Sequence, residues 1–86
     1  METRVAIMSI IVSDMDKTGE LNEYLHDAAP YLIGRMGIPY RKCGISIISI
    51  ALDAPQDLIS ALSGKIGKLE GVSSKVVYSS VINEAE

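Results

Sequence analysis

The chain has 86 residues, a formal net charge of −3 and an apolar fraction of 48% with no tryptophan or phenylalanine. This length allows one domain, which we expect to span residues 1–86, with an ordered core over 3–80 and a mobile tail at 81–86. The acidic balance argues against direct nucleic-acid binding, since phosphate contacts need a basic surface. The aliphatic content exceeds what a small interior can hide, which predicts a homo-oligomer.

The single cysteine and the apolar segment near the start exclude further classes. Cys43 has no second cysteine to pair with, so one chain can form neither a disulfide nor a four-thiolate iron–sulfur cluster. The apolar run that begins at Val5 is too short to span a membrane and is soon followed by Asp14 and Asp16. We therefore expect no signal peptide, no membrane association and a cytoplasmic location.

Residues 3–12 are predicted to form the first strand, because β-branched side chains dominate this segment. Alternate positions are apolar on both faces of such a strand, which indicates a central strand covered on two sides. One face carries Ala6, Met8, Ile10 and Val12, and the other carries Val5, Ile7, Ser9 and Ile11.

A helix should follow this strand. Ser13 and Asp14 are residue types that cap helix N-termini, and Leu21 and Leu25 share one face at helical spacing. Pro30 ends the pattern, because the residue before a proline disfavours helical dihedrals.

The next segments predict two more strands joined by a turn. Residues 31–37 form a weaker strand that contains glycine, residues 37–44 turn the chain, and residues 45–52 form a strand that is apolar on both faces. We expect Asp53 to cap a second helix, since Pro and Gln follow at the spacing of a helix start. Residues 72–80 alternate loosely as a fourth strand.

The element order is therefore βαββαβ, which indicates an α+β, ferredoxin-like fold. Its four-stranded antiparallel sheet has strands one and three in the middle and both helices on one face. The two most apolar predicted strands are the first and the third, so the residue pattern agrees with this topology. The other face of the sheet needs a cover, and a partner subunit is the simplest one.

No residue pattern indicates catalysis, so we predict no catalytic residues and a protein that is not an enzyme. The chain lacks a G-x-S-x-G elbow, and His26 is its one histidine. Metal sites need several converging ligands, and one chain offers only His26 and Cys43 among the preferred side chains. We therefore predict no metal site and no cofactor. The alternative function is a metal-binding sensor that uses His26 or Cys43 across a subunit interface.

The segment at residues 34–44, GRMGIPYRKCG, concentrates positive charge in an acidic chain. It can be a plain turn whose cations keep the end of a hairpin soluble. It can also form salt bridges that lock subunits together, or bind a small anion or carboxylate, because arginine pairs with carboxylates through two hydrogen bonds. The candidate ligand-binding or interface residues are Arg35, Tyr40 and Arg41.

Two stretches, GRMGIPYR and ISALSGKIGKLEGVSSK, carry a family resemblance that extends from about Val5 to Ser80. The chain resembles small bacterial proteins known as iron-only hydrogenase system regulators. These are similar to the ACT-like ligand-binding domain at the C-terminus of the nickel-responsive repressor. The resemblance implies an ACT-like fold, dimers or tetramers, and a regulatory role exercised through an interface ligand or a protein partner.

The resemblance also bears on the ligand and on the partner. The nickel-responsive domain uses several histidines and a cysteine as ligands, whereas this chain has only His26 and Cys43. ACT-like domains often bind amino acids at subunit interfaces near the loop after the first strand, which corresponds here to Ser13–Gly19. A purely structural partner of a maturation enzyme is a further alternative.

Overall fold

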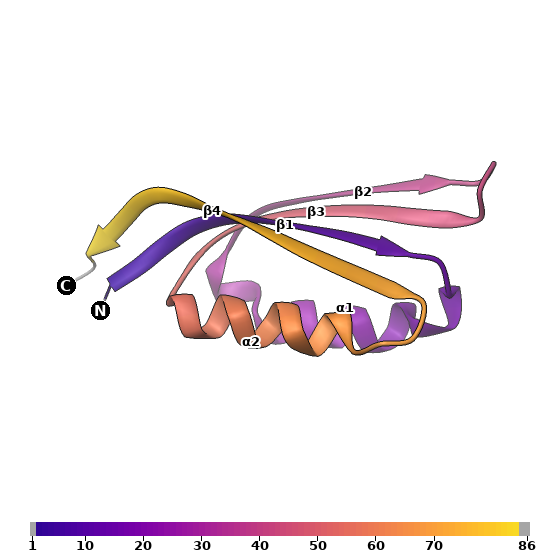
Figure 1. The fold of residues 1–86 in the computed structure, drawn as a ribbon, viewed down its shortest axis with the longest axis horizontal. Coiled ribbons are helices and arrows are strands. Elements are labelled where there is room, and N and C mark those ends of the chain that lie inside the picture. Colours follow the sequence, from indigo (N-terminus) through magenta and orange to yellow (C-terminus); the bar gives the residue numbers. More distant parts are fainter. Residues whose placement is uncertain (1, 85–86) are drawn as a thin grey trace.

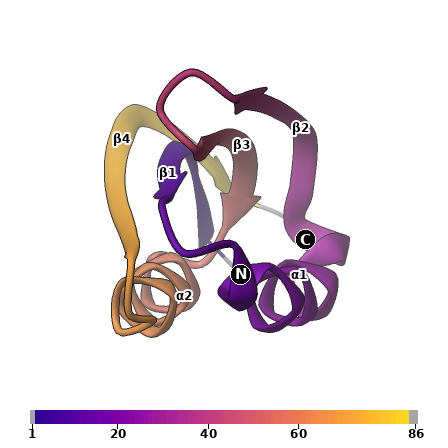
Figure 2. The same ribbon diagram turned by 90° about the vertical axis from the view of Figure 1, so that its right-hand side faces the viewer.

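A computed structural model of the chain describes residues 2–84. Its elements are β1 (Glu2–Val12), the 3-10 helix η1 (Met15–Lys17), α1 (Thr18–Asp27), the 3-10 helix η2 (Ala29–Tyr31), β2 (Leu32–Tyr40), β3 (Ile45–Ala54), α2 (Gln56–Gly67) and β4 (Val72–Glu84). The sheet has the strand order β2-β3-β1-β4 and is antiparallel throughout. Both helices lie against the same face of the sheet (Figures 1 and 2). The predicted α+β, ferredoxin-like fold is confirmed.

The core lies between this face and the two helices. The face of β1 that carries Ala6, Met8, Ile10 and Val12 is the buried one, with Met8 and Ile10 at 0% exposure, and Ile50 and Leu52 of β3 are buried beside them. Their partners are the helix positions Leu21, Leu25, Ile59, Leu62 and Ile66. Burying each such side chain stabilises the fold by about 1.5–3 kcal/mol relative to exposure, so this layer holds the sheet and the helices together.

The first helix starts later than its capping residues predict. Asp14 caps η1, where its Oδ1 accepts from the Asp16 amide at 3.0 Å, and α1 begins at Thr18. Ser13 is occupied elsewhere, because its amide and its hydroxyl both donate to the carbonyl of Gly71, at 2.7 and 2.8 Å. The connection after β1 is thereby tied to the loop before β4.

The predicted turn at residues 37–44 is too long. β2 continues to Tyr40, and the four turn residues are 41–44, with Gly44 at a φ of 64°. Gly37 and Pro39 suggest a turn locally, yet both pair with β3. Pro39 is tolerated because β2 is an edge strand, where a missing N–H can face solvent.

Asp53 does not cap α2. β3 extends to Ala54, which pairs with Arg4, and the residue that precedes the helix is Pro55, which has no side-chain cap. The continuing ladder holds Asp53 in extended backbone, where its Oδ2 accepts from Asn83 Nδ2 at 3.1 Å. Pairing with β1 therefore overrides the local helix-start pattern.

The last strand is longer than expected. β4 pairs with β1 as far as Glu84, beyond an irregularity in the register between Arg4 and Ala6. The expected tail at residues 81–86 thus overlaps a strand at 81–84, and residues 85–86 lie outside the described residues. Within residues 2–84, no helix combines the length and the apolar composition that a membrane crossing requires.

Two glycines with positive φ give a test of this packing. A Cβ at Gly71, whose φ is 75°, would lie 2.5 Å from the Asp14 Cβ, whereas a Cβ at Gly44 would meet nothing within 4 Å. We expect Gly44→Ala to lower the free energy of unfolding by about 1 kcal/mol, and Gly71→Ala by roughly 2–4 kcal/mol. Urea denaturation at one protein concentration measures both, and equal losses would contradict the close approach of Gly71 to Asp14.

Candidate functional site

Nothing in residues 2–84 covers the face of the sheet opposite the helices (Figure 2). We call it the open face. The strand registers and the burial pattern assign to it Val5, Ile7, Ser9, Ile11, Met36, Ile38, Tyr40, Ile45, Ile47, Ser49, Ala51, Asp53, Ser73, Lys75 and Val77.

The apolar side chains of the open face are exposed to an unusual degree. Ile7 is 48% exposed although its neighbour Met8 is fully buried, and Met36 and Val77 reach 56% and 68%. Ile11, Ile38, Tyr40 and Ile47 are exposed as well. Contiguous apolar patches of several hundred square ångströms on a soluble protein generally mark an interaction surface. The open face is therefore our candidate functional site.

Three rows of the open face run across all four strands, and the pairs Val5–Asp53 and Tyr40–Ile45 lie beyond them at the two ends. In the strand order β2, β3, β1, β4, the rows are Gly34, Ala51, Ile7, Val77; then Met36, Ser49, Ser9, Lys75; then Ile38, Ile47, Ile11, Ser73. The side chains of β4 that alternate with this set point to the helices, because the Ser74 and Tyr78 hydroxyls lie 3.0 Å from those of Ser63 and Ser60 on α2. The outer rows are mainly apolar, and the middle row is mainly polar.

The three site residues predicted from sequence do not form one cluster. Tyr40 lies on the open face opposite Ile45, at the end of β2. Arg35 points to the helix side, where its Nη2 donates to the Asn22 Oδ1 of α1 at 3.0 Å. Arg41 is exposed in the turn beside Tyr40. Strand alternation thus separates Arg35 from Tyr40 and leaves Arg41 at the hairpin tip.

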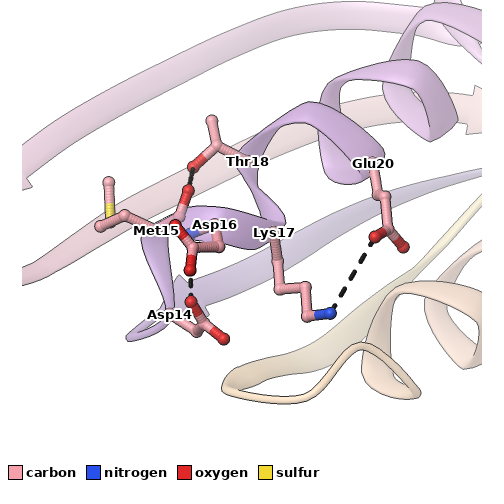
Figure 3. A network of polar contacts seen from close by, with 6 residues as sticks. All are labelled: Asp14, Met15, Asp16, Lys17, Thr18 and Glu20. Atoms are coloured by element: carbon pink, nitrogen blue, oxygen red, sulfur yellow. Dashed lines mark hydrogen bonds and ion pairs between the residues drawn. The ribbon is translucent and has the colours of Figure 1, made fainter.

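The loop after β1, which the resemblance associates with ligands, is held mainly by local contacts (Figure 3). The Thr18 hydroxyl donates to the carbonyl of Met15 at 2.8 Å, and Lys17 Nζ lies 4.0 Å from the Glu20 carboxylate. These contacts fix the loop against the start of α1. They do not point polar groups toward a common centre.

A groove of about 190 Å³ lies between the two helices. Its lining consists of Tyr24, Asp27, Ala28, Leu58, Ala61, Leu62 and Lys65. The Lys65 ammonium lies 4.5 Å from the centroid of the Tyr24 ring, a cation–π contact that already occupies this cation. The groove is smaller than the usual cavity for a drug-sized ligand.

His26 and Cys43 are not brought together within one chain. His26 is exposed near the C-terminal end of α1, and Cys43 is exposed in the turn between β2 and β3. Figure 1 shows that this turn lies beyond the N-terminal end of α1. Among the described residues, no three His, Cys, Asp or Glu side chains are placed to hold a metal ion. A sensor with ligands from two subunits concerns an assembly and stays a prediction.

The element order and the strand order define an α+β, ferredoxin-like domain with an ACT-like fold. The chain superposes on a formyltetrahydrofolate deformylase from Pseudomonas putida KT2440 with a TM-score of 0.63, over 85% of this chain and 28% of that chain. Because the sequence identity is 15%, this likeness shows the fold alone.

The sequence relationship is more specific. The TM1266-like family, described as "Iron-only hydrogenase system regulator, putative", matches residues 4–76. The chain is also similar to the uncharacterized protein TM1266 from Thermotoga maritima, with 35% identity, a TM-score of 0.85, and coverage of 88% of this chain and 96% of that chain. No curated protein matches. The chain belongs to the TM1266-like family, which confirms the resemblance seen in the sequence.

The contact between Arg35 and Asn22 predicts a structural role for Arg35. We expect Arg35→Ala and Asn22→Ala each to lower the free energy of unfolding by about 0.5–1 kcal/mol, since this exposed hydrogen bond ties β2 to α1. The double variant should lose little more than either single one, because both remove the same bond. Arg41→Ala, in the turn, is the control and should change stability by no more than a few tenths of a kcal/mol. Fully additive losses would show that the two residues act independently.

Proposed function

We propose that this chain is a non-catalytic regulatory module of an iron-only hydrogenase system, and that it works as a homodimer in which two open faces cover each other. The observation that carries the proposal is the exposed apolar surface on a strand, β1, whose other face is buried from Ala6 to Val12. The description of the TM1266-like family as a system regulator supports the regulatory part of the proposal.

The size of the open face suits a small specific interface. Strands lie about 4.8 Å apart and rise about 3.3 Å per residue, so four strands paired over the length from Arg4 to Val12 cover roughly 500–600 Å². Two copies would then bury roughly 1,000–1,200 Å², which is at the lower limit for a specific protein–protein interface. A reversible dimer fits this area better than a permanent one.

The chemistry of the face favours a second copy as its cover. Sheets pack face to face at about 10 Å when aliphatic side chains of both interdigitate, and the outer rows supply Ile7, Ile11, Ile47 and Val77 for this packing. A two-fold axis would use the same patch on both subunits, so one sequence pattern serves both sides. Larger assemblies could be built from such dimers.

The polar side chains that have defined partners serve packing, which supports a binding role over a catalytic one. The Ser60 and Ser63 hydroxyls join α2 to β4, and the Ser13 hydroxyl closes the loop onto Gly71. Regulation would then work through assembly: a ligand or protein that binds one state better shifts the population toward that state.

The double variant Ile7→Lys/Ile11→Lys tests this proposal. We expect the wild-type chain to sediment as a dimer and the double variant as a monomer with an unchanged circular dichroism spectrum, because both side chains are exposed in the single chain. Met15→Lys is the matched control: Met15 is 51% exposed but lies in η1, away from the open face, so this variant should remain a dimer. A monomeric wild-type chain would overturn the proposal.

The regulatory part needs a test in cells that contain an iron-only hydrogenase. Replacing the native gene by the double variant should change hydrogenase activity as much as deleting the gene does, whereas the Met15→Lys control should behave as the wild type. If cells with the double variant have the hydrogenase activity of wild-type cells, the dimer is not the regulatory form.

A further inference from the structure

The middle row of the open face places two hydroxyls and one ammonium group in line across the sheet. Ser9 pairs with Ser49 on one side and with Lys75 on the other. The row is flanked by the apolar neighbours Ala51, Ile7 and Val77 toward one end of the sheet, and by Ile47 and Ile11 toward the other. These three polar side chains thus form a narrow band inside a largely apolar surface.

Among the described residues, these groups have no side-chain partner. The side-chain hydrogen bonds and the ion pair found in residues 2–84 involve none of the Ser9, Ser49 and Lys75 side chains. The carboxylate nearest in register on the open face is Asp53, four residues beyond Ser49 along β3, and its Oδ2 accepts from Asn83. In the single chain, water is therefore the partner of the band.

Covering the open face removes that water. An unpaired hydroxyl loses the hydrogen bonds that it made in water, and an unpaired ammonium loses still more. A face-to-face dimer would also bring the two Lys75 cations, one from each copy, into the same interface. The outer rows favour the dimer while the middle row opposes it, unless an anion enters with the second copy.

We propose that Lys75, Ser9 and Ser49 bind a small anion that carries a carboxylate or phosphate group, and that this anion is enclosed between two copies of the chain. The ammonium group neutralises the negative charge, and the serine hydroxyls donate hydrogen bonds to its oxygens. Since the site is complete only in the dimer, the anion stabilises the dimer through mass action. This inference rests on the proposed dimer and names the ligand that controls it.

A lysine on β4 also has a simpler function, because lysines on edge strands discourage pairing with other chains. That function would require neither the serines nor an anion, and added anions would then leave the dimer dissociation constant unchanged. The two explanations therefore predict different responses to added anions.

The test measures the dimer dissociation constant by sedimentation with inorganic phosphate or succinate, each compared with sodium chloride at equal ionic strength. The two anions represent the phosphate and the carboxylate classes. We expect at least one to tighten the wild-type dimer tenfold or more. Ser9→Ala should reduce this effect, because it removes one donor from each copy.

Lys75→Met separates the charge from the apolar stem of the side chain. This variant should dimerise more tightly than the wild type without added anion, and it should respond to neither anion. Lys68→Met, at the exposed end of α2, is the control and should keep the wild-type response. Because both lysines are exposed in the single chain, neither variant should disturb folding.

The outcomes separate this inference from the proposed function. A wild-type dimer that responds to neither anion, or a Lys75→Met dimer that is weaker than the wild type, would overturn the anion site and leave the dimer standing. If Asp53→Asn abolishes the dimer and the wild-type dimer responds to neither anion, Lys75 pairs with the Asp53 carboxylate of the second copy. This outcome would also overturn the anion site. A chain that is monomeric with and without anions would overturn both proposals.

Discussion

The structure depends on one constraint: its two central strands, β1 and β3, carry apolar side chains on both faces, and the helices can cover only one of them. Side-chain alternation forces Met8 and Ile10 to one face and Ile7 and Ile11 to the other, and a shift of the register by a single residue would exchange the two sets. The inward set makes the core with the helices. The outward set makes the surface on which the proposed assembly rests, so the same strand pattern determines both fold and interface.

The parts of the fold that sequence predicts well are those with a strong local signal. The two central strands are nearly continuous apolar runs, and Leu21 and Leu25 recur at helical spacing, so these elements can be located from the residues alone. The errors occur where a local signal competes with pairing. Gly37 and Pro39 predict a turn, yet both lie in β2 because that strand pairs with β3. Asp53 predicts a helix cap, yet it lies in β3 because that strand continues to pair with β1. A short segment of sequence around a residue does not show which distant strand its backbone will pair with.

The candidate site shows the same limit more clearly. Proximity in a cationic segment of the sequence groups Arg35, Tyr40 and Arg41, but strand alternation places Arg35 against Asn22 and Tyr40 on the open face. Conversely, Ser9 and Lys75 lie at nearly opposite ends of the sequence and become neighbours only through the pairing of β1 with β4. In the sequence each serine only interrupts an apolar strand. The side chains that lie beside it are determined by the pairing of that strand with its neighbours.

A polar band inside an apolar interface is physically reasonable for a regulator. If the whole face were apolar, the dimer would be tighter. A ligand shifts an equilibrium only by its differential affinity for the two states, so it would then change the fraction of dimer less. An interface of modest area that contains an unpaired ammonium from each copy keeps monomer and dimer closer in free energy. A small binding contribution at Lys75 can then move the population from one state to the other. The residues that weaken the dimer would be the ones that make it controllable.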